Sequence, residues 1–150
     1  MTEIWSEDIK NALTDRIMRI APGVRIYKEA SSAPEYPHFF IHQISVSDTE
    51  ERRRYHRLSY SFDVRYRAAS DSSTVLNLQR ELDSMALRLF SGLCIIECGD
   101  GKIRCEDKNC EKTDGVLHFF VTVKVRAIED SGTRNGKLGK LTVRVGLNGR

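Results

Sequence analysis

The chain has 150 residues, of which 40% are hydrophobic and 30% are charged, a length that suits one domain with a single core. No apolar run approaches the roughly 18 residues of a membrane-spanning helix, so the composition excludes a membrane protein and a wholly disordered chain. The 24 basic residues exceed the 21 acidic ones by three. That excess is too small to indicate nucleic-acid or membrane-surface binding by itself.

The first 21 residues predict an amphipathic helix over 2–21. Its apolar residues recur every three or four positions, and Pro22 and Gly23 end it. Glu3, Glu7 and Asp8 lie near its start, which is unlike the basic and then apolar layout of a secretory signal. We therefore expect the protein to stay in the compartment where it is made.

Three strands are predicted next, over residues 24–28, 38–46 and 55–68, with a polar turn over 47–54 between the last two. The third strand alternates: its even positions are mostly apolar, whereas its odd positions from Arg57 to Arg67 are all polar. This alternation predicts one face against the core and one face in water.

The second half predicts a helix from the cap candidates at 71–73 to Gly92, followed by strands over 93–97, 102–111 and 116–128. Turn signals at 99–101 and 113–115 separate these strands. The predicted element order is therefore α-β-β-β-α-β-β-β, within one domain that spans residues 1–128.

Residues 129–150 are predicted to form a basic, glycine-rich arm. Five Lys or Arg and no acid lie between residues 131 and 150, and subtracting those charges from +3 leaves −2 for the rest of the chain. Such an arm is either flexible or exchanges a strand. The strand would include Leu141, Val143 and Val145, and it would pair with its own sheet or with another subunit. In the second case, truncation after Ile128 weakens the oligomer.

A zinc site is one candidate role for the four cysteines, which lie within 17 residues: Cys94, Cys98, Cys105 and Cys110. Structural zinc favours short Cys-x2–4-Cys turns, whereas residues four apart in a strand are separated by about 13 Å. We therefore predict reduced thiols and no metal or other cofactor. The four histidines fall in predicted strands without a metal-binding motif.

Asp63 and Glu81 support one enzyme hypothesis, in which the protein is a small metal-dependent nuclease. The expected Glu-x-Lys companion is missing. Ser61 and Arg65 flank Asp63 on the same strand face and are both positioned to pair with it instead. Phosphate-binding and hydrolase motifs are also missing. No catalytic residue is predicted.

Arginines form the clearest charge feature. They are Arg52, Arg53, Arg54, Arg57, Arg65 and Arg67, and the last three lie on the polar face of one strand. A solvated face is the ordinary interpretation, but nearby acids suit a surface that meets an oppositely charged partner. Aromatic residues of this strand point to its other face, which disfavours base stacking.

Four segments in order resemble the phage tail terminator family: PGVRIYKE at 22–29, PHFFI at 37–41, RRYHR at 53–57 and YSFDVRY at 60–66. The resemblance covers residues 1–128. It implies an α+β subunit with a mixed, mainly antiparallel sheet and two helices packed on one face. It also implies a structural, non-enzymatic protein of long-tailed phages and of prophages in Gram-positive bacteria.

The resemblance further implies a homo-oligomeric ring, generally a hexamer, that caps the tail tube and stops its polymerisation. The partners would be the tail tube protein and the head–tail connector, with DNA passing through the ring without sequence-specific binding and with no membrane partner. The protein would assemble in the host cytoplasm and reside in the virion tail. Another neck or head-completion role is the alternative within the virion.

Overall fold

The computed structural model describes residues 6–29, 32–52, 54–68, 75–99, 101–129 and 141–144. The described elements confirm the predicted order and add one strand at the end. They are α1 (Ser6–Ile20), β1 (Arg25–Tyr27), β2 (His38–Glu50), β3 (Tyr55–Arg67), α2 (Val75–Gly92), β4 (Ile95–Cys98), β5 (Gly101–Thr113), β6 (Val116–Glu129) and β7 (Leu141–Arg144).

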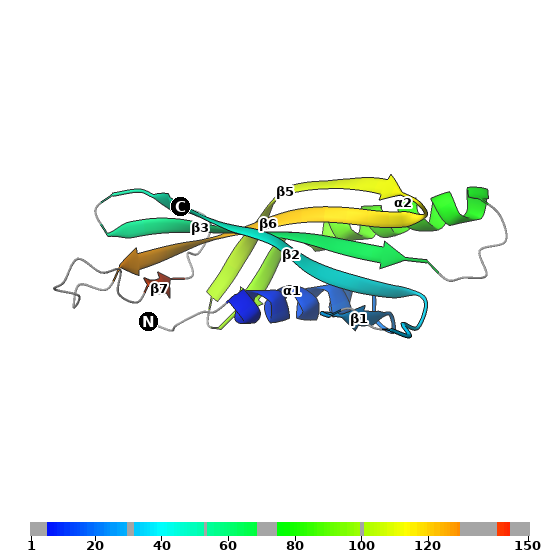
Figure 1. Ribbon diagram of the computed structural model, residues 1–150, viewed down its shortest axis with the longest axis horizontal. Coiled ribbons are helices and arrows are strands. Elements are labelled where there is room, and N and C mark those ends of the chain that lie inside the picture. Colours follow the sequence, from blue (N-terminus) through cyan, green and yellow to red (C-terminus); the bar gives the residue numbers. More distant parts are fainter. Residues whose placement is uncertain are drawn as a thin grey trace.

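One strongly twisted sheet organises the fold, in the strand order β1-β2-β3-β6-β5-β4 (Figure 1). β1 pairs with β2 in parallel, and all other neighbours pair antiparallel, so the α+β class with a mixed, mainly antiparallel sheet is confirmed. β2 and β3 form a long hairpin whose tip lies at one end of the sheet, beyond the described helices (Figure 1).

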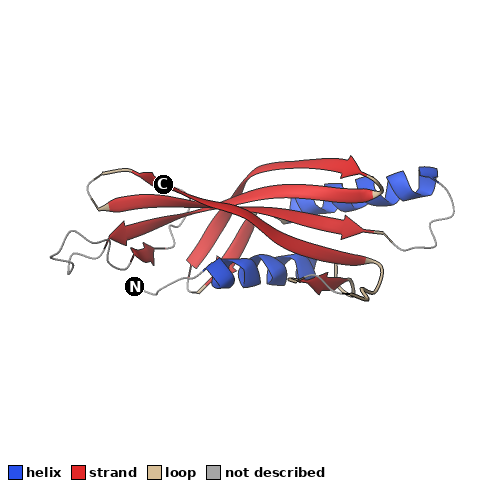
Figure 2. Cartoon of the chain, in the orientation of Figure 1, coloured by secondary structure: helices blue, strands red, loops and turns tan. Residues whose placement is uncertain are grey.

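Both helices pack on one face of the sheet, which carries the even-numbered residues of β3. Tyr60 on this face lies against the start of α1, since its hydroxyl bonds with Ser6. Tyr66 on the same face donates to Glu81 of α2 at 3.1 Å. Phe90 of α2 packs edge-to-face on Phe119 of β6, with ring centroids 4.9 Å apart. The helices therefore cover the apolar face that the alternation predicted (Figure 2).

The core lies between these helices and the sheet. Its largest fully buried side chains come from both helices and from five strands, and include Ile9, Leu13, Ile17, Phe39, Ile41, Phe62, Leu82, Leu89, Ile96, Ile103 and Phe119. Each fully buried aliphatic or aromatic side chain contributes about 1.5–3 kcal/mol, so this cluster is the main source of stability. Neither described helix is long and apolar enough to span a membrane.

β2 is longer than predicted. Its last residues, 47–50, are strand and not turn, because they pair with residues 56–59 of β3 despite their polarity. The prediction was wrong here because polar side chains in a strand exposed to water carry no alternating signal. A register shift between Gln43 and Ser45 interrupts the pairing.

β7 pairs with the chain's own β6, which is one of the two alternatives predicted for this segment. Leu141 lies opposite Glu129, and Val143 lies opposite Ala127. β5 pairs with β6 only as far as Val123, so β7 continues along the edge that β5 leaves. Val145 lies outside the described residues, as do the predicted helix starts at 2–5 and 71–73.

Candidate interaction surface

The face of the sheet opposite the helices is the candidate interaction surface. It carries the odd-numbered residues of β3, and no described helix packs on it (Figure 1). The pleat confirms the prediction for this strand, because even positions from His56 to Tyr66 are buried while most odd positions are partly exposed. Asp63 is the exception, since it is an odd-numbered residue that is buried.

The first part of the surface is the tip of the β2–β3 hairpin. Arg52 and Arg54 are exposed in its turn, which is closed by backbone hydrogen bonds from Glu51 to Tyr55 and from Tyr55 to Arg52, both 2.8 Å. Arg53 lies outside the described residues. The exposed guanidinium groups are thus held on a short, well-bonded turn.

Acids of the hairpin pair with neighbours in the same subunit. Glu51 lies 3.5 Å from Arg57 Nε and 3.7 Å from Arg126 Nε. Both carboxylate oxygens of Asp48 lie 2.9 Å from Nδ1 of the buried His56. Glu50 differs, because it is exposed and forms no ion pair with any described residue.

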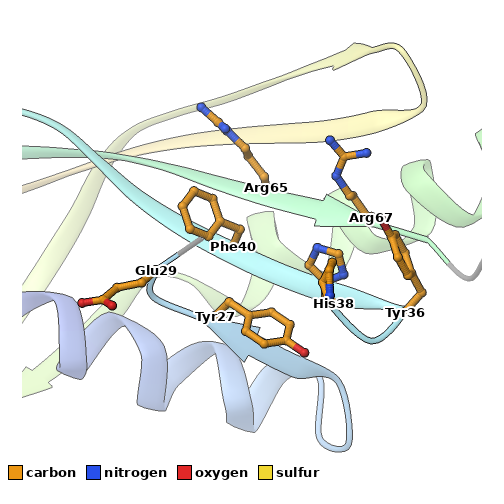
Figure 3. Close-up of a pocket in the computed structure, with 8 residues that line it drawn as sticks. Tyr27, Glu29, Tyr36, His38, Phe40, Arg65 and Arg67 are labelled. Carbon is orange, nitrogen blue, oxygen red and sulfur yellow. The ribbon is translucent and has the colours of Figure 1, made fainter. Parts of the chain in front are cut away.

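The second part is a pocket of about 370 Å³ at the opposite end of β2 and β3 (Figure 3). The pocket is called the arginine–aromatic pocket below, and its lining comes from β1, β2, β3 and the loop between β1 and β2. The lining residues are Tyr27, Glu29, Pro34, Tyr36, His38, Phe40, Arg65 and Arg67.

Arg65 is held in place on the pocket wall. Its Nε donates to Asp63 Oδ2 at 2.8 Å, and its guanidinium carbon lies 5.7 Å from the centre of the Phe40 ring. The same Asp63 oxygen lies 3.0 Å from His118 Nδ1 of β6. Asp63 Oδ1 is buried and has no hydrogen-bond partner among the described residues. The prediction that Arg65 pairs with Asp63 is confirmed.

His38 forms the base of the pocket. It is buried, and its Nδ1 lies 3.0 Å from the carbonyl oxygen of Glu35. Edge-to-face contacts join its ring to Tyr27 and to Tyr36, with centroids 5.4 and 4.8 Å apart. Burial lowers the pKa of His38 despite the Glu35 hydrogen bond, and the nearby Arg67 lowers it further. The neutral imidazole therefore predominates at neutral pH.

Aromatic side chains lie beside the arginines, contrary to the expectation from β3 alone. Tyr60, Phe62 and Tyr66 do point to the helix face, but β1 and β2 bring Tyr27 and Phe40 to the arginine face. Residue pairing puts Tyr27 opposite Phe40 and Phe40 opposite Arg65, so the three side chains form one row. The correction arises because neighbours within a sheet come from other strands, which a single-strand pattern does not include.

The predicted arginines that the structure describes divide between these two parts. Arg57 and Arg65 are eight residues apart in one strand, which separates them by about 26 Å. Arg52, Arg54 and Arg57 therefore belong to the hairpin tip, and Arg65 and Arg67 belong to the pocket. Backbone pairing places the predicted Leu141 and Val143 on β7 beside β6.

Asp63 and Glu81, the two residues of the nuclease hypothesis, lie on opposite faces of the sheet. Asp63 points to the outer face, whereas Glu81 bonds with Tyr66 on the helix face. The four cysteines are free; Cys98 and Cys105 are buried, Cys110 is half-buried and Cys94 is exposed. Within the described ranges, no group of three or more His, Cys, Asp or Glu side chains is arranged to hold a metal ion.

A comparison with protein families identifies the family of this chain. A family described as phage tail terminator protein matches residues 8–134, which include strands β1 to β6, α2 and nearly all of α1. No curated protein matches the chain.

Proposed function

The chain belongs to the phage tail terminator family, and from this premise we propose that copies of it form a ring that caps the tail tube. Membership makes the protein a structural component of the virion tail. The proposed ring, a hexamer, stops tube polymerisation and presents the surface that the head–tail connector joins. DNA passes through its centre without sequence-specific contacts, and the subunit needs no cofactor.

One observation carries the proposal: the subunit presents different surfaces at the two ends of one sheet. The hairpin tip carries exposed arginines and an exposed Glu50, and the other end carries the arginine–aromatic pocket. Ring closure requires heterologous contacts, in which one patch meets a different patch on the next copy. A long subunit with unlike ends meets that requirement.

Exposed apolar side chains on β2 support the same proposal. Ile44 and Val46 are about half exposed, and Tyr55 at the start of β3 is 41% exposed. Their exposure on these two strands leaves apolar surface available for contact with another chain. Burying them in an assembly interface removes apolar surface from water.

The protein's assembly with tail tubes tests the proposal. We expect native mass spectrometry to show a closed oligomer, alone or after addition of purified tail tubes, and electron microscopy to show density capping one tube end. A chain that stays monomeric in both conditions and leaves tube length unchanged contradicts the proposal.

A neck or head-completion position is the second candidate, because the same surface charges suit contact with a connector protein. Labelled protein in assembled particles separates the two positions. Density at the end of free tails supports the terminator role, whereas density confined to tail-less heads supports the alternative.

A further inference from the structure

We propose that the arginine–aromatic pocket receives the Glu50 carboxylate from the hairpin tip of a second copy of this chain. This inference rests on the proposed ring and gives it a specific contact between subunits. Arg67 and Arg65 provide the positive charge, the aromatic rings provide the walls, and the exposed end of β2 provides the ligand.

The pocket's arginines fit a carboxylate. Arg65 is oriented by the hydrogen bond from its Nε to Asp63. The terminal nitrogens of its guanidinium group take no part in that bond. Arg67 is exposed and pairs with no carboxylate among the described residues. In Figure 3 both guanidinium groups lie above the rings of Phe40 and His38. Guanidinium groups arranged in this way favour planar, charge-assisted bonds to a carboxylate.

Other lining residues limit which anion fits. The buried His38 is neutral at neutral pH and adds no positive charge, and Glu29 contributes a carboxylate to the wall. A polyanion such as a nucleic acid would bring several phosphates toward Glu29, at a cost in repulsion. A protein segment with one unpaired carboxylate avoids most of that cost.

The hairpin tip offers such a carboxylate in Glu50, with the exposed Arg52 and Arg54 of the turn close by in the chain. Asp48 is engaged by His56, and Glu51 is engaged by Arg57 and Arg126. Glu50 alone of these three acids has no described ion-pair partner, and its neighbour Thr49 is uncharged and exposed. The tip therefore offers one available carboxylate on a strand that already has a fixed conformation, which lowers the entropy lost on binding.

The two partners cannot meet within one subunit. His38 and Glu50 begin and end the same strand, and twelve residue steps along a strand span about 40 Å. Figure 1 shows the tip and β1 at opposite ends of the sheet. The contact must therefore join two copies, tip to pocket, and repeating it generates a head-to-tail series that closes into a ring.

Charge reversal and mixing test this contact. Glu50→Arg and Arg67→Glu are each expected to weaken self-association at least tenfold, as measured by sedimentation equilibrium with and without tail tubes. An equimolar mixture of the two variants should restore association, because the reversed tip of one variant then meets the reversed pocket of the other. The double variant should also associate. Matched controls are Glu97→Arg and Arg104→Glu, which reverse exposed charges on β4 and β5 and should leave association within about twofold.

The outcomes distinguish the contact from the ring. If the single variants associate and cap tubes like the wild type, the contact is overturned and the proposed function stands. If both single variants are folded by circular dichroism but the mixture does not recover association, the pairing of these two residues is overturned. A wild-type chain that stays monomeric with and without tubes overturns both. If Arg67→Glu leaves association intact but abolishes binding of fluorescent oligothymidylate, the pocket binds nucleic acid instead.

Discussion

Asp63 and Arg65 lie two residues apart on the outer face of β3, and the Arg65 Nε donates to Asp63 Oδ2 at 2.8 Å. The carboxylate is almost fully buried, with 6% of its side chain exposed, whereas the arginine side chain is 39% exposed. A buried anion thus orients a cation that reaches the pocket. The same oxygen lies 3.0 Å from His118 of β6, so the carboxylate also joins two strands.

Replacing this carboxylate should destabilise the fold. Asp63→Asn removes the charge that faces Arg65 and His118 inside the sheet, and we expect a loss of about 1–3 kcal/mol in the free energy of unfolding. Urea denaturation at pH 7.5 measures it. The control is Asp83→Asn, whose 60% exposed side chain pairs with Lys112 on the surface and should cost less than about 1 kcal/mol. Equal losses would contradict a special role for Asp63.

Substitutions at Ile20 and Gly92, the last residues of α1 and α2, should have coupled effects on stability. A Cβ added at Gly92 would lie 2.7 Å from Ile20 Cγ1, closer than atoms pack, so Gly92→Ala should cost about 1–3 kcal/mol of stability. In an Ile20→Ala background the obstructing atoms are gone and the cost should fall by at least about 1 kcal/mol. Thermal denaturation of the four proteins of this cycle measures the coupling, and additive effects would contradict the predicted contact.

Thiol reactivity should follow burial. Burial raises the pKa of Cys105 to about 12 and also raises that of Cys98. The thiolate is the reactive form, so both should resist iodoacetamide at pH 8, whereas the exposed Cys94 should react first. Peptide mass spectrometry after timed quenching assigns the modified sites. Denatured protein provides the control, in which all four should react at similar rates. Modification of native Cys105 as fast as Cys94 would contradict the buried assignment.

Stability should depend on pH through His38. Its pKa is lowered in the folded state, so the unfolded chain binds the proton more readily, and this contribution to stability is lost as pH falls below the unfolded value of 6.5. His38→Gln should be less stable than the wild type at pH 7.5, and the difference should narrow at pH 5.5. Urea denaturation at both pH values measures it. The exposed His42→Gln serves as control and should change stability less than His38→Gln at pH 7.5. A stability difference between His38→Gln and the wild type that widens at low pH would contradict the predicted sign.

Much of the fold could be predicted from periodicity. The apolar stripes of α1 and α2 and the alternation of β3 and β6 identify the residues that face the core, because helices repeat every 3.6 residues and strands every two. These patterns are local, so they are readable in one segment at a time. The polar end of β2 carried no such pattern, and the prediction ended that strand too early.

The site was less predictable than the fold. Arg52, Arg53 and Arg54 were predicted in the turn before the strand, and Arg57, Arg65 and Arg67 on its polar face. The division of the strand's arginines between a tip and a pocket depends on the length of the strand and on what lies beside each end. Glu29, Tyr36 and His38 carry no motif that marks them as pocket residues. Only the loop between β1 and β2 brings them together.

By itself, the sequence determined which face of each element is apolar and the order of the elements, since side-chain chemistry and local spacing decide both. Strand pairing required the tertiary structure. Register between β1, β2 and β3 put Tyr27 and Phe40 in one row with Arg65, and pairing between β3 and β6 put His118 beside Asp63. These contacts join residues as much as 55 positions apart, and they arise from backbone hydrogen bonds that any side chain permits. The charge of +3 is therefore less informative than the positions at which the sheet places its arginines and acids.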